Sequence, residues 1–85
     1  MSAKYFILPK KVNKHISKFL LNVQNKIDQA FDKIKSNPIS GIKLGGELTK
    51  YYKFRIGDHR IVYKFDKKES LVEVVRVEHR QGVYK

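Results

Sequence analysis

The chain of 85 residues is long enough for one hydrophobic core, which predicts a single domain spanning residues 1–85. It has no cysteine, which excludes disulfides and thiolate metal sites. No apolar run approaches the roughly 20 residues of a membrane-spanning helix, so a cytoplasmic protein is expected. Nineteen Lys and Arg against eight Asp and Glu give a net charge of +11.

The N-terminal half predicts a short strand followed by two helices. Residues 5–8 are apolar and are followed by a proline, which the first turn of a helix tolerates. Apolar residues then recur at spacings of three and four, the periodicity of an amphipathic helix. One helix over 9–36 would be about 42 Å long at 1.5 Å per residue, which is awkward for so small a domain. We therefore expect a break near 22–25, giving a helical hairpin, and an end of the second helix at Asn37-Pro38.

The C-terminal half predicts three strands. The glycine-bearing segment 39–49 is expected to be a loop. Residues 51–56 and 59–65 alternate apolar and polar side chains, and the Gly-Asp pair between them is a two-residue hairpin signal. After a polar turn, a valine-rich strand covers 71–77. The predicted fold class is α+β, with an N-terminal strand and a two-helix hairpin packed on a twisted antiparallel β-sheet.

The two-residue turn fixes the register of the hairpin and separates its side chains into two faces. The apolar face, expected to lie against the helices, consists of Tyr52, Phe54, Ile56, Ile61, Tyr63 and Phe65. The other face carries Tyr51, Lys53, Arg55, Arg60, Val62 and Lys64. Arg55 is directly opposite Arg60 there, and like charges in such a pair destabilise a sheet. A basic face with no local carboxylate suits a phosphate-bearing ligand. The alternative interpretation is a face that only contacts solvent, with its long side chains pointing away from one another.

The net charge and the arginines indicate an anionic partner. Nucleic acid is the first candidate, followed by an acidic protein or an anionic membrane, and a surface kept basic only for solubility is the alternative. Arginine grips phosphate with a planar fork, and all four arginines lie in the C-terminal half: Arg55, Arg60, Arg76 and Arg80. On the last strand, alternation groups Arg76 and Arg80 with Val72, Val74 and Glu78, opposite Leu71, Glu73, Val75, Val77 and His79. If Arg76 and Arg80 join the basic face, every arginine converges there.

The segments YKFRIGDHRIVYKFD and VEVVRVEHRQGVYK resemble the RelE/ParE toxin superfamily. Its members carry an arginine-bearing strand, a tight turn, an Arg-x-x-Tyr strand and a closing His-Arg-x-x-Val-Tyr. The corresponding residues here are Arg55, Gly57, Arg60 with Tyr63, and His79, Arg80, Val83 and Tyr84. The resemblance implies a RelE-like fold whose sheet cradles RNA, cleavage of mRNA in the ribosomal A site, inhibition of translation, and neutralisation by a cognate acidic antitoxin. No cofactor is expected.

The same resemblance implies roles for five residues. Lys53 and Arg55 fall on the family's basic pair and Arg60 on its phosphate-binding arginine. Arg80 falls on the arginine at the end of the last strand, and Tyr84 on the tyrosine that stacks on a base. Arg55 stands where some relatives have lysine, which leaves the proton-transfer assignment open.

Metal-free RNA cleavage needs a base for the 2′-hydroxyl, cations for the phosphorane and an acid for the 5′-oxygen. Arginine does not readily release a proton, so Arg55, Arg60 and Arg80 are interpreted as charge stabilisers. Lys53 is the first candidate for the base, because neighbouring positive charges favour a neutral amine. His79 is the rival, although alternation places it away from the basic face.

Further RNA contacts are expected from Arg76 and Lys64 on the strands, and from Lys10 and Lys14 on the first helix. For these two lysines, the alternative interpretation is a helix face that only contacts solvent. The three histidines have no metal-ligand spacing, so no metal site is expected. Two other functions stay open. One is a ParE-type inhibitor of DNA gyrase, and the other is a non-catalytic RNA-binding module.

Overall fold

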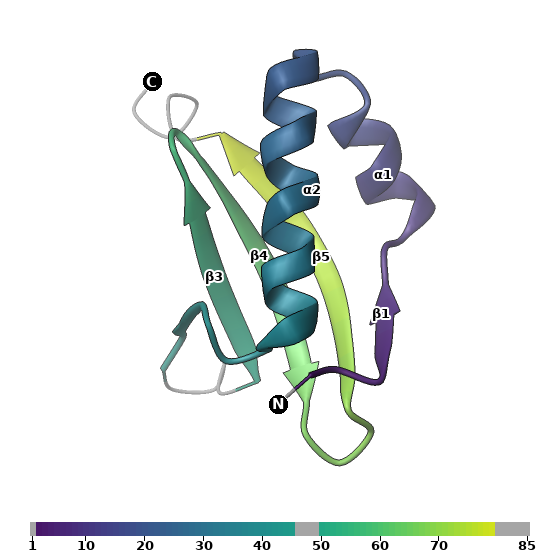
Figure 1. Cartoon of the computed structure of the whole chain (residues 1–85), viewed down its shortest axis with the longest axis vertical. Helices are drawn as coiled ribbons and strands as arrows, with labels where there is room; N and C mark the ends of the chain where they lie inside the picture. The colour runs from purple at the N-terminus through teal and green to yellow at the C-terminus, as the bar shows by residue number, and fades with distance from the viewer. Residues whose placement is uncertain (1, 46–49, 80–85) are drawn as a thin grey trace.

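The computed structural model describes residues 2–45 and 50–79. In this part of the chain, two helices cover one face of a five-stranded sheet (Figure 1). The helices are α1 (Lys10–Ile16) and α2 (Leu21–Ser36). The strands are β1 (Tyr5–Ile7), β2 (Ile42–Lys43), β3 (Tyr51–Ile56), β4 (His59–Asp66) and β5 (Leu71–His79), in the spatial order β1-β5-β4-β3-β2. The predicted α+β class is confirmed.

The sheet is mixed, whereas the sequence predicted an antiparallel one. Strands β2 to β5 pair antiparallel, but β1 pairs with β5 in parallel, with Tyr5 opposite Leu71. A parallel neighbour requires a long connection along the chain, and the helices supply it between β1 and the other strands.

The predicted helical hairpin is present, but its break lies at 17–20 and not near 22–25. The side-chain amide of Gln24 donates to the carbonyls of Ser17 and Phe19 at 3.3 and 2.9 Å, which satisfies backbone groups at the turn. The asparagines that suggested a later break are exposed on the first turns of α2, where they are tolerated. Helix α2 ends at Ser36, as predicted. Within the described residues, neither helix has the length and hydropathy needed to span a bilayer.

The segment expected to be a loop contains the short edge strand β2. Its residues Ile42 and Lys43 pair with Lys53 and Tyr52 of β3, and the amide of Leu44 donates to the Tyr51 carbonyl at 2.9 Å. A strand of two residues is too short to show the alternation that predicts strands from sequence.

The core lies between the helices and the apolar face of the sheet. Helix α2 contributes Ile27, Ala30, Phe31 and Ile34, and the middle strands contribute Tyr52, Ile61, Tyr63 and Phe65. Phe54 and Ile56 of the predicted apolar face pack at its margin. The division of the hairpin into an apolar and a basic face is therefore confirmed.

A β-bulge interrupts the pairing of β4 with β5. Val62 pairs with Arg76 but its neighbour Tyr63 pairs with Val74, which leaves Val75 as an extra residue. An extra residue reverses the alternation of side chains beyond it. The buried valines consequently lie on both sides of the bulge: Val72, Val74 and Val77. The predicted grouping of Val72 and Val74 with Arg76 and Glu78 is therefore wrong.

Candidate functional site

The predicted basic residues lie on the sheet face turned away from the helices, here called the outer face. Cross-strand register arranges this face in three rows. The row nearest the β3–β4 turn is Arg55, Arg60 and Glu78; the next is Lys53, Val62 and Arg76; the third is Tyr51, Lys64 and Glu73. The turn itself is the predicted Gly-Asp pair, and Gly57 has a φ of 57°, a conformation that glycine adopts without strain.

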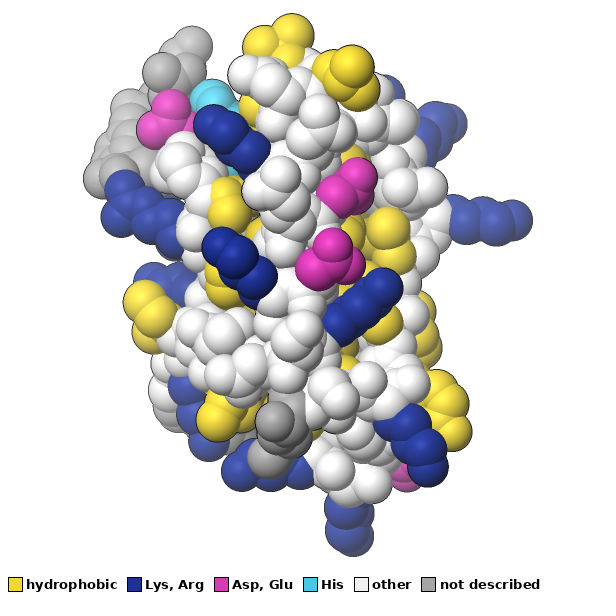
Figure 2. Space-filling model, viewed as in Figure 1, with side chains coloured by type: hydrophobic (Ala, Val, Ile, Leu, Met, Phe, Trp, Pro, Cys, Tyr) yellow, Lys and Arg dark blue, Asp and Glu magenta, His cyan; other side chains and the backbone are white. Residues whose placement is uncertain are grey.

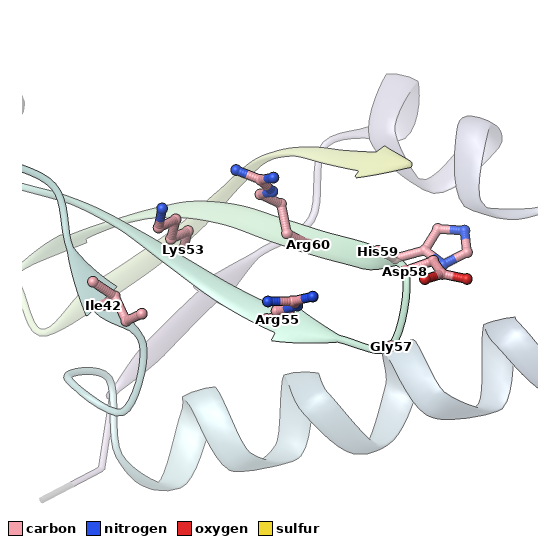
Figure 3. A pocket seen from close by; sticks show the side chains of 7 residues that line it. All are labelled: Ile42, Lys53, Arg55, Gly57, Asp58, His59 and Arg60. Atoms are coloured by element: carbon pink, nitrogen blue, oxygen red, sulfur yellow. The ribbon is translucent and has the colours of Figure 1, made fainter. Parts of the chain in front are cut away.

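A pocket of about 180 Å³ opens beside this turn (Figure 3). The structure brings Lys53, Arg55 and Arg60 together in its lining, and the remaining lining residues are Ile42, Gly57, Asp58 and His59. Pockets that enclose whole small molecules have volumes of roughly 300–1,000 Å³, so this pocket suits a group of about the size of a phosphate. Figure 3 shows Lys53 and Arg60 projecting from the same side of the sheet.

The outer face also carries carboxylates, so the expectation of a face without them is wrong. Glu78 accepts a hydrogen bond from Arg76 Nε at 2.6 Å and lies 3.7 Å from Arg60 Nε. Lys64 Nζ lies 4.0 Å from Glu73. Such solvent-exposed pairs typically contribute about 0–1 kcal/mol each. Among the described residues, no carboxylate lies within 4.0 Å of Lys53 or Arg55.

Three of the four arginines share the outer face. Arg76 joins Arg55 and Arg60 there, across the sheet from Lys53. Arg80 and Tyr84, together with Val83 of the closing motif, lie outside the described residues. The convergence of Arg80 with the other arginines stays a prediction.

His79 lies on the helical side of the sheet. Its ring centroid is 4.4 Å from that of His59, which pairs with it across β4 and β5. The His59 ring is in turn 5.0 Å from Phe19, and Phe19 is 5.0 Å from His15. Burial lowers the pKa of His59, and the nearby His79 and Lys26 lower it further. The negative charge of Asp58 acts in the opposite direction. The His59–His79 contact was missed because the sequence did not determine the register between β4 and β5.

The remaining predicted contact residues lie apart from the pocket. Lys10 and Lys14 are exposed on α1, and neither lines the pocket. Figure 2 shows that Lys and Arg side chains also stand on the helical side of the molecule, interspersed with acidic ones. The net charge therefore does not by itself locate a site. In residues 2–45 and 50–79, no three His, Asp or Glu side chains form a group that could hold a metal ion.

Comparison with known families identifies the chain. A family model described as ParE toxin of type II toxin-antitoxin system, parDE, matches residues 10–84. The chain belongs to this toxin family. The resemblance to the RelE/ParE superfamily is thereby confirmed, and the protein is a type II toxin of that superfamily. No match was found among curated protein sequences.

Solved structures of RelE toxins share the fold of this toxin. A mutant of the E. coli toxin RelE in the free state superposes with a TM-score of 0.79 at 20% identity, covering 99% of this chain and 90% of that one. A chain of the RelBE2 toxin–antitoxin complex from Mycobacterium tuberculosis gives 0.78 at 23% identity, with 94% of each chain covered. The archaeal RelE–RelB complex from Pyrococcus horikoshii gives 0.76 at 18% identity, covering 94% of this chain and 97% of that one. Identities this low establish the shared fold alone.

Proposed function

We propose that this toxin is a RelE-type endoribonuclease that cleaves mRNA in the ribosomal A site and so inhibits translation. The observation that carries the proposal is the pocket lined by Lys53, Arg55 and Arg60. Opposed arginines disfavour the sheet, and an anionic ligand between them relieves that repulsion. A phosphodiester matches the pocket in both charge and size.

Each basic residue has a role in the proposed reaction. Lys53 accepts the proton of the 2′-hydroxyl, and the 2′-oxygen attacks the neighbouring phosphorus. Arg55 and Arg60 stabilise the negative charge of the phosphorane. The bond to the 5′-oxygen then breaks, and that oxygen takes up a proton from solvent water, which leaves a 2′,3′-cyclic phosphate and a 5′-hydroxyl. This sequence of steps requires no cofactor and no metal ion.

The C-terminal residues complete the proposal. Arg80 would add a further cation, and Tyr84 would stack on a nucleobase, as the resemblance implies. His79 is the weaker candidate for the base, because its ring contacts His59 on the helical side of the sheet. Arg76 and Lys64 would contact RNA beyond the scissile phosphate, and Lys10 and Lys14 would contact the ribosomal RNA backbone.

The proposed protein partner is a cognate acidic antitoxin, which would act in the cytoplasm together with the toxin. The M. tuberculosis structure is a toxin–antitoxin complex, and the P. horikoshii structure is a complex of RelE with RelB. The net charge of +11 favours an acidic protein as such a partner.

Inhibition of DNA gyrase is the second candidate function, because the matching family model is described as ParE toxin. A paired assay separates the two functions. The purified toxin is added to ribosomes translating a defined mRNA and, in parallel, to gyrase supercoiling a plasmid. The proposal predicts new mRNA ends with undisturbed supercoiling. Loss of supercoiling with intact mRNA would instead support the gyrase inhibitor, and RNA binding without cleavage or gyrase inhibition would support a non-catalytic module.

A further inference from the structure

Strand β2 places an aliphatic side chain beside the phosphate-sized pocket. Ile42 is 65% exposed, yet it lines the pocket together with Lys53 and Arg55. It also lines an adjoining hollow with Ser40, Gly41 and Phe54. Figure 3 shows Ile42 on the segment alongside β3, at the end of the pocket away from Gly57. The basic site therefore has an apolar margin.

The position of Ile42 is fixed by a buried hydroxyl. Tyr63 is 0% exposed, and its hydroxyl donates a hydrogen bond to the Pro38 carbonyl at 2.7 Å and accepts one from the Gly41 amide at 3.1 Å. This single side chain therefore ties both ends of the turn between α2 and β2 to the middle of the sheet.

A glycine permits the close approach of β2 to β3. A Cβ atom on Gly41 would lie 2.7 Å from the Lys53 carbonyl oxygen and 2.8 Å from the Tyr63 hydroxyl, which is closer than side chains tolerate. The next residue, Ile42, then pairs with Lys53. The chain thus holds Ile42 directly beside the residue proposed as the base.

We propose that Ile42 is the contact for a nucleobase flanking the scissile phosphate, which makes β2 part of the RNA-binding site. This inference rests on the proposed ribonuclease function. Edge strands usually carry charged residues, and an exposed isoleucine gains free energy only when a ligand covers it. A ligand that fills the cationic pocket and also covers Ile42 needs an anionic group next to a flat, weakly polar one. A nucleotide of single-stranded RNA has both.

The test compares Ile42→Ala with Ile39→Ala. Ile39 is a matched control, since it is an isoleucine three residues away that is 48% exposed and does not line the pocket. Each variant is assayed on translated mRNAs that differ only in the bases flanking the cleavage site. Ile42→Ala should raise KM about fivefold, because loss of the burial of about one methylene group has roughly that effect on affinity. The kcat should change little. The substitution should also change the preference among flanking bases. Ile39→Ala should match the wild type, and Ile42→Val should recover most of the affinity.

The outcomes separate this inference from the ribonuclease proposal. If the wild type cleaves mRNA and Ile42→Ala retains its KM and base preference, the inference is wrong while the ribonuclease proposal stands. The same holds if Ile42→Ala weakens only the binding of an acidic antitoxin, which would make β2 a protein contact. If the wild type does not cleave, fluorescence anisotropy with short single-stranded RNA tests Ile42 independently. Equal affinity of the two alanine variants would then overturn the inference.

Discussion

Arg55 and Arg60 lie directly opposite each other on β3 and β4, one pair in from the tight turn of the hairpin. Glu78, the neighbour of Arg60 on β5, is shared between Arg60 and Arg76. Arg55 has no carboxylate within 4.0 Å among the described residues. The pair therefore concentrates positive charge in a pocket at some cost to the stability of the sheet.

Replacing Arg55 with Gln should stabilise the toxin while it impairs cleavage. Removing a like-charge pair from opposite strands should raise the free energy of unfolding by about 0.2–1 kcal/mol, and most at low ionic strength. Urea denaturation at low and high salt measures this difference. Lys67→Gln, in the exposed β4–β5 turn, is the control for a lost surface charge. A destabilised Arg55→Gln would show that the pair does not carry net repulsion.

Replacing Lys53 with Met should abolish cleavage but leave most RNA binding intact. The substitution removes the proposed proton acceptor, while Arg55 and Arg60 still bind phosphate. Cleavage and RNA affinity are measured together for Lys53→Met and His79→Ala. Normal cleavage by Lys53→Met together with inactivity of His79→Ala would assign the base to His79 instead.

Replacing Tyr63 with Phe should destabilise the fold and weaken substrate binding. The substitution leaves the buried Pro38 carbonyl and the Gly41 amide without their partner, at a cost of about 1–3 kcal/mol. A looser β2 should also raise KM more than it lowers kcat. Thermal denaturation and steady-state cleavage check the two effects, with Tyr52→Phe as the matched tyrosine control. Unchanged stability of Tyr63→Phe would show that the hydroxyl does not hold the turn.

The stability of the toxin should fall as the pH drops below about 6.5, the ordinary pKa of histidine. Burial and the charge of His79 lower the pKa of His59 in the folded state. The unfolded chain therefore binds the proton at a higher pH than the folded chain does, and protonation favours unfolding until the pH lies below both values. Urea midpoints measured from pH 7.5 downwards should show a smaller loss for His59→Gln than for the wild type. His15→Gln, on the exposed side of α1, should behave like the wild type, and an equal loss in His59→Gln would rule out His59 as the cause.

The hairpin was predictable because a two-residue turn determines which side chains face each other. Its register, its apolar face and the Arg55–Arg60 pair all follow from the Gly-Asp turn. The grouping of Arg55 and Arg60 with Lys53 in one pocket follows from the same alternation. Proline residues similarly indicated where two elements end: Pro9 follows the first strand, and Pro38 follows the second helix.

Features set by tertiary packing could not be predicted in this way. The extra residue Val75 has no local sequence signal, so Val72 and Val74 were grouped with Arg76 and Glu78 although they face the core. The longer turn between β4 and β5 left their register open, so the contact of Glu78 with Arg60 was not predicted. Strand β2 exists because Gly41 and the Tyr63 hydroxyl bring a two-residue segment against β3, a contact between residues far apart in the sequence. The break between the helices contains no proline or glycine, and the Gln24 amide, from the following helix, satisfies two of its carbonyls.

The most direct test of the central claim is to map mRNA ends by primer extension after induced expression of the toxin. Wild type is compared with Lys53→Met, with Lys67→Met as a control for the loss of a lysine outside the pocket. We predict discrete new ends within translated regions for wild type and Lys67→Met, and none for Lys53→Met. Growth arrest by the wild type without any new mRNA ends would contradict the claim that the basic pocket cleaves RNA.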